Sequence, residues 1–466
     1  MQKARIESDL LGELHVPESA YYGVQTQRAI NNFKISNHKL SHYPEFVKAL
    51  GVVKLGAAQA NHELGVLSDE LYQAIAYASN ELIKGKYADE FPIDMIQGGA
   101  GTSVNMNANE VIANVALEYM GKNKGDYQFC SPNDHVNLSQ STNDAYPTAL
   151  KIALFEMNKP LVNALEKLFF ALDKKAADFK NVIKMGRTQL QDAVPMTLGQ
   201  EFEGFAITLK REVINLQRVA AQLLEINMGA TAIGTGLNAV PGYAQLCTSK
   251  ISEIMNEPVK LSENLVEATS DTSSFVDYSS ALKKLCIKLS KICNDLRLLT
   301  SGPRTGLFEI NLPPKQPGSS IMPGKVNPVI PEVVNQVCFK VIGNDLTVSF
   351  AAEAGQLQLN VMEPIIGFSI IESIQYLTNA MTTLREECVE GITANVEHLK
   401  QEVQNSIGIV TALNPHIGYK ASTKIAKEAL ATGASVYNLV LQRNLLSKNE
   451  LDAILDPKNM LGPHNN

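Results

Sequence analysis

The sequence lacks several features that mark whole classes of protein. No uninterrupted apolar run in its 466 residues approaches the length of a membrane span, and the N-terminal residues MQKARIE contain no apolar core of a secretory signal. Basic residues are not in excess, because 41 Lys and Arg stand against 48 Asp and Glu, a formal net charge of −7. We therefore expect a cytoplasmic protein that binds neither a membrane nor a nucleic acid.

Cysteine is sparse, and metal and nucleotide motifs are missing. The six cysteines show no CxxC spacing, and several fall in helical apolar patterns, so we expect buried thiols of a reducing compartment. His38 and His42 have an HxxxH spacing without a carboxylate between them. Residues 234–239 match a dinucleotide fingerprint letter by letter, but no strand pattern precedes them. The sequence thus predicts no metal and no cofactor.

Glycine and proline are absent from two long stretches, residues 259–301 and 368–390. In the first, apolar residues recur at alternating steps of three and four, the pattern of a long helix in a bundle. These residues are Phe275, Tyr278, Leu282, Leu285, Leu289, Ile292, Leu296 and Leu299. Val276, Ile287 and Leu298 lie off this seam, so we expect the helix to be buried on more than one side.

Two further segments repeat the helical period. They are Leu161, Leu165, Leu168, Leu172, Ala176 and Phe179, and then Phe205, Leu209, Val213, Leu216, Ala220 and Leu223. Helices this long and this apolar need one another, and other subunits, to bury their faces. We predict a mainly all-α protein built as an elongated long-helix bundle. Along the chain we expect a mixed, mostly helical domain at 1–138, the central bundle at 139–394 and a small helical domain at 395–466.

Residues 318–328, GSSIMPGKVNP, predict a loop with the parts of an anion site. Two glycines and two prolines exclude a regular helix or a central strand. The loop carries a hydroxyl at Ser319, a cation at Lys325 and an amide at Asn327. The alternative for a stretch of this composition is a solvated surface loop.

Three other polar motifs lie in loops between the predicted helices. Residues 98–107, GGAGTSVNMN, place glycines and then hydroxyls at a helix start, which suits either a bound anion or an ordinary helix cap. Residues 139–144, SQSTND, offer more neutral donors than one cap requires, and residues 186–192, GRTQLQD, form the third motif. The candidate binding residues in these motifs are Thr102, Ser141, Thr142, Asn143, Thr188 and Gln189.

These four motifs resemble those of the fumarase/aspartase superfamily, and so do residues 16–23, VPESAYYG. The resemblance covers nearly the whole chain. It implies an enzyme that eliminates ammonia, water or a larger amine from a succinyl-type small molecule and releases fumarate. It also implies a three-domain subunit in a homotetramer whose active sites are shared between subunits.

The resemblance implies that Ser319 is the base that removes a proton from carbon. A serine is a weak base at its usual pKa, so loop N–H groups and the nearby Lys325 would have to stabilise its oxyanion. Lys325 and Asn327, with Thr188 beside them, would hold one substrate carboxylate. Neutral hydroxyls suit the other carboxylate, which becomes a dianionic aci-carboxylate on deprotonation. The hydroxyls with the chemistry for it are Thr102, Ser141 and Thr142.

Two positions favour ammonia over water as the leaving group. Class II fumarases usually carry His where this chain has Gln189, and SSND where it has residues 141–144. Glutamine has no proton to exchange near neutral pH, so it cannot serve as the acid or base for water. The carbonyl groups of Asn143 and Gln189 would instead accept hydrogen bonds from an ammonium group. The resemblance thus implies elimination of ammonia from L-aspartate, with a class II fumarase and a non-enzymatic helical scaffold as the alternatives.

Overall fold

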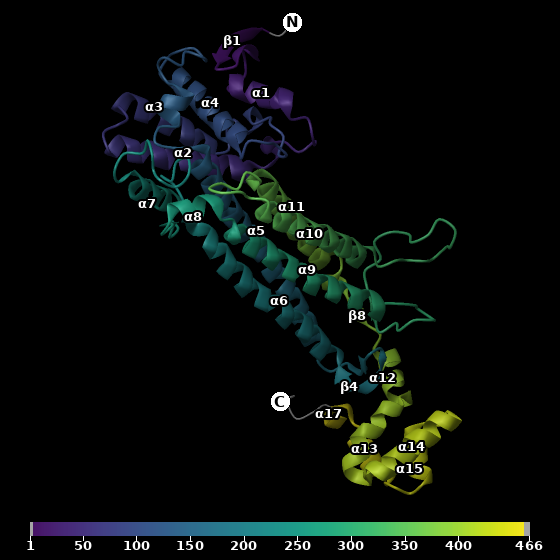
Figure 1. Cartoon of the computed structure of the whole chain (residues 1–466). Helices are drawn as coiled ribbons and strands as arrows, with labels where there is room; N and C mark the ends of the chain where they lie inside the picture. Colours follow the sequence, from purple (N-terminus) through teal and green to yellow (C-terminus); the bar gives the residue numbers. More distant parts are fainter. Residues whose placement is uncertain (1–2, 461–466) are drawn as a thin grey trace. The chain divides into compact units, whose positions relative to one another are not determined.

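A computed structural model describes residues 3–460, and within them the fold is mainly α-helical, as predicted (Figure 1). The first helices are α1 Val24–Asn32, α2 Pro44–Glu63, α3 Asp69–Ile83, α4 Thr102–Tyr119, α5 Thr142–Asp178, α6 Leu198–Ala220, α7 Tyr243–Met255 and α8 Leu265–Ser270. They are followed by α9 Ser273–Leu299, α10 Val329–Glu353, α11 Glu363–Glu387, α12 Val396–Asn405, α13 Val410–Ile417, α14 Tyr419–Thr432, α15 Val436–Gln442, α16 Lys448–Ile454 and α17 Pro457–Met460. Single helical turns lie at Leu40–His42, Ala88–Glu90, Pro132–Val136, Ala221–Leu224, Val389–Gly391 and Ile407–Ile409.

The strands of the described residues form only two-stranded sheets. They are β1 Ala4–Asp9, β2 Gly12–Pro17, β3 Ile183–Thr188, β4 Gln191–Thr197, β5 Glu225–Ile226, β6 Lys260–Leu261, β7 Ile310–Asn311 and β8 Thr393–Ala394. The β1–β2, β3–β4 and β7–β8 pairs are antiparallel, and β5–β6 is parallel. Sheets this small cannot form a core of their own, so the helices carry the fold.

The chain forms two compact units, each assembled from three segments. The first contains the chain up to Val162 together with Ile214–Lys284 and Phe339–Leu377. The second contains Asn163–Val213, Leu285–Cys338 and the chain from Thr378 onwards. The ends of these segments fall inside α5, α6, α9, α10 and α11. The division into three regions along the sequence remains a prediction.

The seam predicted for residues 275–299 lies on α9, and all eight of its apolar side chains are buried. Polar contacts join α9 to its neighbours in each unit. In the first unit, the Tyr278 hydroxyl donates to Asn158 Oδ1 on α5 at 2.8 Å. In the second, Asn335 on α10 donates through Nδ2 to Ser290 Oγ at 2.8 Å. Within each unit, segments of the long helices therefore run beside one another (Figure 1).

Two of the three off-seam residues of α9 differ from the expectation, whereas Val276 is half-buried. Ile287 is 57% exposed and Leu298 is 40% exposed, so this chain alone does not cover a second side of the helix. The two other predicted seams are buried throughout, apart from a partly exposed Ala176. The helix predicted from residues 368–390 is α11.

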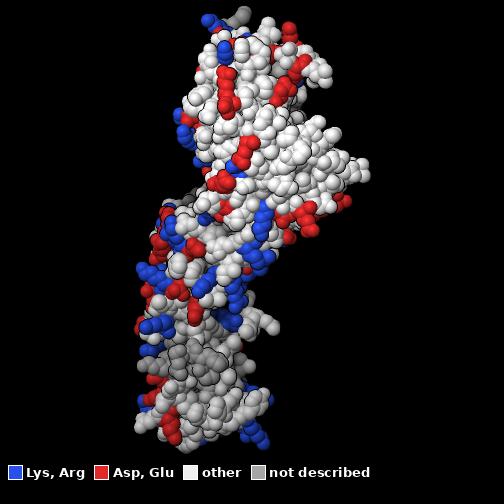
Figure 2. Space-filling view, turned by 90° about the vertical axis from the view of Figure 1, so that its left-hand side faces the viewer, with Lys and Arg blue, Asp and Glu red and all other residues white. Residues whose placement is uncertain are grey.

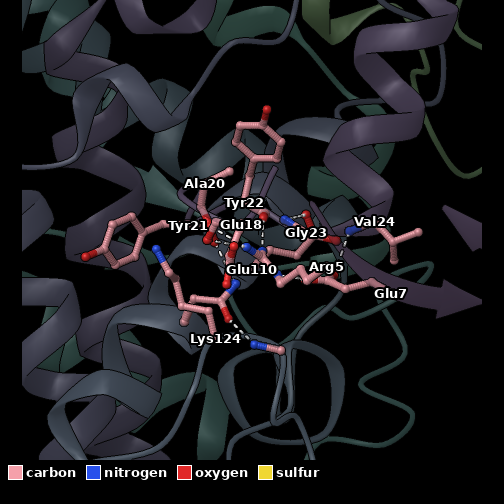
Figure 3. A network of polar contacts seen from close by, with 12 residues as sticks. Arg5, Glu7, Glu18, Ala20, Tyr21, Tyr22, Gly23, Val24, Glu110 and Lys124 are labelled. Atoms are coloured by element: carbon pink, nitrogen blue, oxygen red, sulfur yellow. Dashed lines mark hydrogen bonds and ion pairs between the residues drawn. The ribbon is translucent and has the colours of Figure 1, made fainter. Parts of the chain in front are cut away.

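In the first unit, a partly buried charge network fixes the N-terminal segment against α4 (Figure 3). The Arg5 guanidinium donates to the backbone carbonyls of residues 17, 18, 20 and 22 and to Glu7. Glu110 of α4 accepts from the N–H groups of Gly23, Gln25 and Thr26, where α1 begins. Burial raises the pKa of Glu110 to about 7. Since Gly23 has no side chain to cap α1, Glu110 takes over that function.

A separate cluster of short helices, α12 to α16, follows β8 in the second unit. These helices lie within residues 395–466, where the sequence predicts a small helical domain. The core of this cluster includes Val403, Leu413, Ile425, Leu439 and Leu451, and Met185 of β3 packs into it. Of the helices in residues 3–460, none has the length and apolar character that crossing a bilayer requires.

Candidate functional site

The first polar motif forms the start of α4. Gly101 precedes the helix with a φ of +87°, and a Cβ there would lie 2.4 Å from the ring of Tyr146 on α5. Only glycine fits this position, which brings the N-terminus of α4 against the first turns of α5. Thr102, the first residue of α4, is exposed. Its hydroxyl therefore stands at a helix N-terminus, where the helix dipole favours a negative charge.

The second motif forms the start of α5, and a buried carboxylate holds it in place. Asp144, which is fully buried, accepts from the N–H groups of Ser141 (2.9 Å), Gly229 (3.1 Å) and Thr231 (2.9 Å). Burial raises the pKa of Asp144 to about 6, although these N–H groups oppose the shift. Asp144 thus ties the first turn of α5 to the loop that follows β5.

The hydroxyls of this motif are oriented as donors. Ser141 Oγ accepts from the Asn143 N–H at 3.2 Å, and Thr142 Oγ1 accepts from Asn105 Nδ2 at 3.2 Å. Because an amide N–H can only donate, each hydroxyl oxygen is already an acceptor and its own proton is left for another partner. Two half-buried hydroxyls that present protons suit a bound carboxylate.

Asn143, in contrast to these hydroxyl donors, is oriented as a hydrogen-bond acceptor. Its Nδ2 donates to the Ala232 carbonyl at 2.7 Å, and its backbone carbonyl accepts from Asn227 Nδ2 at 3.1 Å. This arrangement leaves the Asn143 Oδ1 atom as an acceptor. A carbonyl oxygen of this kind suits a cationic group such as an ammonium.

The third motif lies at the tip of the β3–β4 hairpin. Thr188 pairs with Gln191, so the turn consists of Gln189 and Leu190, with φ values of 54° and 62°. Both residues are exposed and adopt the left-handed conformation of a type I′ turn, which costs a non-glycine residue about 1–2 kcal/mol. Thr188 and Gln189 therefore project from a strained tip.

Buried ion pairs hold the strand that leads to this tip. Glu309, which is fully buried, receives the Lys184 ammonium at 2.5 Å and also pairs with the Arg187 guanidinium. Arg187 lies 3.6 Å from Glu402 of α12 as well. Because Arg187 is occupied by these carboxylates, it anchors the hairpin, and we assign it no contact with substrate.

The signature motif, residues 318–328, has no regular secondary structure, as predicted. The Gly318 N–H donates to the Lys325 carbonyl at 2.7 Å, and Asn327 Nδ2 donates to the Gly318 carbonyl at 2.9 Å. A Cβ on Gly318 would lie 2.8 Å from the Lys325 carbonyl oxygen, so glycine is needed for this closure. These bonds close the segment into a loop with Ser319 at its start.

Ser319 occupies a nest of backbone donors. Its Oγ accepts from the N–H groups of Ile321 at 3.2 Å and Met322 at 3.0 Å. Two N–H groups aimed at one hydroxyl oxygen stabilise negative charge on it. Lys325 is exposed and has no ion pair with a described carboxylate, and Asn327 keeps one of its two amide protons for another acceptor.

The candidate residues thus fall into three groups within one chain. Contacts bring the start of α4, with Thr102, next to Ser141, Thr142 and Asn143 at the start of α5. The hairpin tip carries Thr188 and Gln189, and the loop of residues 318–328 carries Ser319, Lys325 and Asn327. Among the described residues, no hydrogen bond or ion pair joins the tip to this loop. Two residues behind the start of α5 have no role predicted from the sequence: Asn105, which donates to Thr142, and Lys54, which donates to Asn105. A lysine inside the apolar run of α2 was the signal of a buried charge.

Comparison with known proteins identifies the family. A family described as lyase matches residues 12–343, and one described as the fumarase C C-terminus matches residues 409–462. The chain belongs to the lyase family. The predicted family, fold class and enzyme class are therefore confirmed.

Individual lyases resemble the chain over nearly its whole length. Aspartate ammonia-lyase of Pseudomonas aeruginosa is 58% identical over 99% of this chain and 97% of its own. The enzyme of the same name from Escherichia coli K12 is 58% identical over 98% and 96%. A Brucella melitensis structure, described as fumarate lyase:delta crystallin bound to cobalt, has a TM-score of 0.97 and 53% identity over 99% of this chain and all of its own. Class II fumarase of Schistosoma mansoni has a TM-score of 0.93 and 35% identity over 99% and 100%.

Proposed function

We propose that this lyase eliminates ammonia from L-aspartate and releases fumarate. The observation that carries the proposal is the 58% identity, over 98–99% of the chain, to relatives named aspartate ammonia-lyase. The class II fumarase among the structural relatives shares 35% of its sequence. Hydration of fumarate to malate is accordingly the second candidate.

Ser319 is the proposed base. With its proton lost, Ser319 Oγ would be stabilised by the N–H groups of Ile321 and Met322 and by the positive charge of Lys325 in the same loop. The oxyanion takes a proton from the β-carbon of aspartate, and the electron pair moves into the adjacent carboxylate. The C–N bond then breaks, ammonia leaves, and the carbon–carbon double bond of fumarate forms.

The two substrate carboxylates need different partners. One gains a second negative charge in the aci-carboxylate, and the proposed donors to it are the outward-facing protons of Ser141 and Thr142, with Thr102 at the start of α4. The other keeps a constant charge, which suits the Lys325 ammonium and the remaining amide proton of Asn327. Thr188 adds a hydroxyl to that second set.

The leaving group selects between aspartate and malate. The Asn143 Oδ1 atom is oriented as an acceptor because its Nδ2 is bonded to Ala232. Gln189 stands at the hairpin tip with a side-chain carbonyl that also accepts. Two acceptors favour an ammonium, which only donates, over a hydroxyl, and neither residue titrates near neutral pH.

We further propose a homotetramer in the cytoplasm, with each active site built from several chains. Large apolar side chains on α5, α6, α9 and α10 are between 57% and 65% exposed in a single chain: Phe170, Ile214, Ile287, Phe339, Leu346 and Phe350. The face in Figure 2 likewise has broad areas without a charged residue. Surface of this kind supports burial against other subunits. The six buried thiols support a reducing compartment.

The test follows fumarate by its ultraviolet absorbance after addition of L-aspartate and, separately, of L-malate. We expect fumarate and an equal amount of ammonia from aspartate, and a far slower reaction with malate. If malate is converted as readily as aspartate, the ammonia-lyase proposal is wrong and the fumarase alternative replaces it.

A further inference from the structure

A lysine with no part in the proposed chemistry lies buried behind the start of α5. Lys54 of α2 has no exposed surface, and no described carboxylate forms an ion pair with it. Its ammonium donates to the side-chain oxygens of Asn105 (2.7 Å), Gln140 (2.8 Å) and Asn137 (3.2 Å). Three donors therefore meet three amide oxygens. Burial lowers the pKa of Lys54 to about 7, and the charge of Asp144 opposes that shift. The three amide oxygens supply the direct hydrogen bonds that an ammonium needs in the interior.

The ammonium fixes which way the Asn105 amide faces. Because Asn105 Oδ1 is held by Lys54, its Nδ2 faces away and donates to Asn137 Oδ1 at 3.1 Å and to Thr142 Oγ1 at 3.2 Å. The flipped amide would place its NH₂ group against the ammonium and its oxygen against the Asn137 oxygen. Both contacts would be repulsive, so a cation on Lys54 permits one orientation only.

This orientation decides the direction of the Thr142 hydroxyl. Since Asn105 Nδ2 donates to Thr142 Oγ1, the threonine proton cannot point toward Asn105. We propose that Lys54 and Asn105 form a buried relay that keeps the Thr142 hydroxyl turned as a donor to the substrate carboxylate. The inference rests on the proposed function. Both members are positioning residues, because neither is among the proposed contacts of the substrate.

Gln140 provides a matched control for Asn105. It accepts from the same ammonium at 2.8 Å, but its Nε2 donates to the backbone carbonyls of Val136 (3.0 Å) and Leu138 (3.1 Å) and has no bond to Thr142. Asn105→Asp and Gln140→Glu each place a carboxylate beside Lys54. Only the first removes the N–H that donates to Thr142.

The experiment compares these two variants in the full-length assembled enzyme. We expect Asn105→Asp to lower kcat/KM about 10–100-fold, mostly through kcat, because the new carboxylate attracts the Thr142 proton and a charge-assisted hydrogen bond to the transition state is lost. Gln140→Glu should stay within about threefold of wild type. Thermal unfolding of the two variants should be similar. Equal losses of activity would overturn the relay.

A double-mutant cycle tests the route through Thr142. In a Thr142→Val background the hydroxyl is gone, so adding Asn105→Asp should cost no more than about threefold. A full additional loss would overturn the inference, since Asn105 would then act by another path. If Asn105→Asp does not fold, two variants of Lys54 replace the comparison of Asn105→Asp with Gln140→Glu. Lys54→Arg keeps the cation, and Lys54→Met removes it. The arginine variant is then expected to retain kcat, and equal kcat losses in both would refute the relay.

Assays with two substrates distinguish a failure of this inference from a failure of the proposed function. All variants are assayed with L-aspartate and with L-malate. If only malate reacts, the ammonia-lyase proposal fails, and the comparison of Asn105→Asp with Gln140→Glu still decides the relay, because malate carries the same carboxylates. A wild-type enzyme inactive with both substrates would overturn both.

Discussion

Replacing Ser319 by alanine separates a base from an ordinary loop hydroxyl. The structural cost should be small, because the side chain lies in an exposed loop and water can replace it as the partner of the Ile321 and Met322 N–H groups. We expect the free energy of unfolding to change by less than about 0.5 kcal/mol. Loss of a positioned base lowers turnover by about 10²–10⁴-fold, equivalent to about 3–5 kcal/mol of transition-state stabilisation.

The assay measures kcat for fumarate release, together with the assembly state and thermal unfolding of the same preparation. Ser320→Ala is the control, because Ser320 is the exposed neighbour and its hydroxyl has no hydrogen bond among the described residues. We expect Ser320→Ala to keep kcat within about threefold. A correctly assembled Ser319→Ala enzyme that retains a tenth or more of the wild-type kcat would refute the assignment of the base.

Three further predictions concern assembly, the hairpin and pH. Co-assembly of inactive Thr102→Val and Lys325→Met chains should restore part of the activity if sites are shared between chains, and persistent inactivity of the mixed oligomers would argue against sharing. Glu309→Gln should lower the free energy of unfolding, measured by denaturant titration, by about 3–5 kcal/mol, because Lys184 and Arg187 lose their buried carboxylate. As a control, Glu387→Gln removes a more exposed ion pair and should cost less than about 1 kcal/mol. Burial raises the pKa of Glu363 to about 8. Between about pH 4.5 and 8 this carboxyl therefore keeps its proton in the folded chain and has lost it in the unfolded chain. The contribution of Glu363 to the free energy of unfolding thus falls as pH rises through this range. Glu363→Gln should thus raise Tm at pH 9 and leave it unchanged near pH 4; an equal gain at both would contradict the pKa.

The helices were predictable because their signal is repeated many times. The α9 seam returns every three or four residues over seven turns, and each residue in it is buried. The hairpin tip was not predictable, because Gln189 and Leu190 have no preference for positive φ. Its conformation is instead imposed by strand pairing and by the buried pair between Arg187 and Glu309, residues 122 positions apart.

The candidate residues were predicted from the sequence, but the orientation of their hydrogen-bonding groups was not. Which atom of Asn143 faces a ligand depends on a carbonyl 89 residues away, and the direction of the Thr142 proton depends on Asn105, 37 residues away. The residue type determines which hydrogen bonds a side chain can donate or accept. Only tertiary contacts decide which of those capacities is left over for the substrate.

The distribution of charge in the three groups fits the demands of the proposed reaction. A carboxylate whose charge does not change is best held by a fixed cation, and Lys325 is the only cation among the nine candidate residues. A carboxylate that becomes a dianion needs partners whose interaction strengthens as charge develops, without binding the ground state too tightly. The Ser141 and Thr142 hydroxyls meet that requirement because other hydrogen bonds have already turned their protons outward. In the proposed relay, the buried cation at Lys54 acts on the reacting carboxylate through Asn105, and so contributes orientation in place of direct charge.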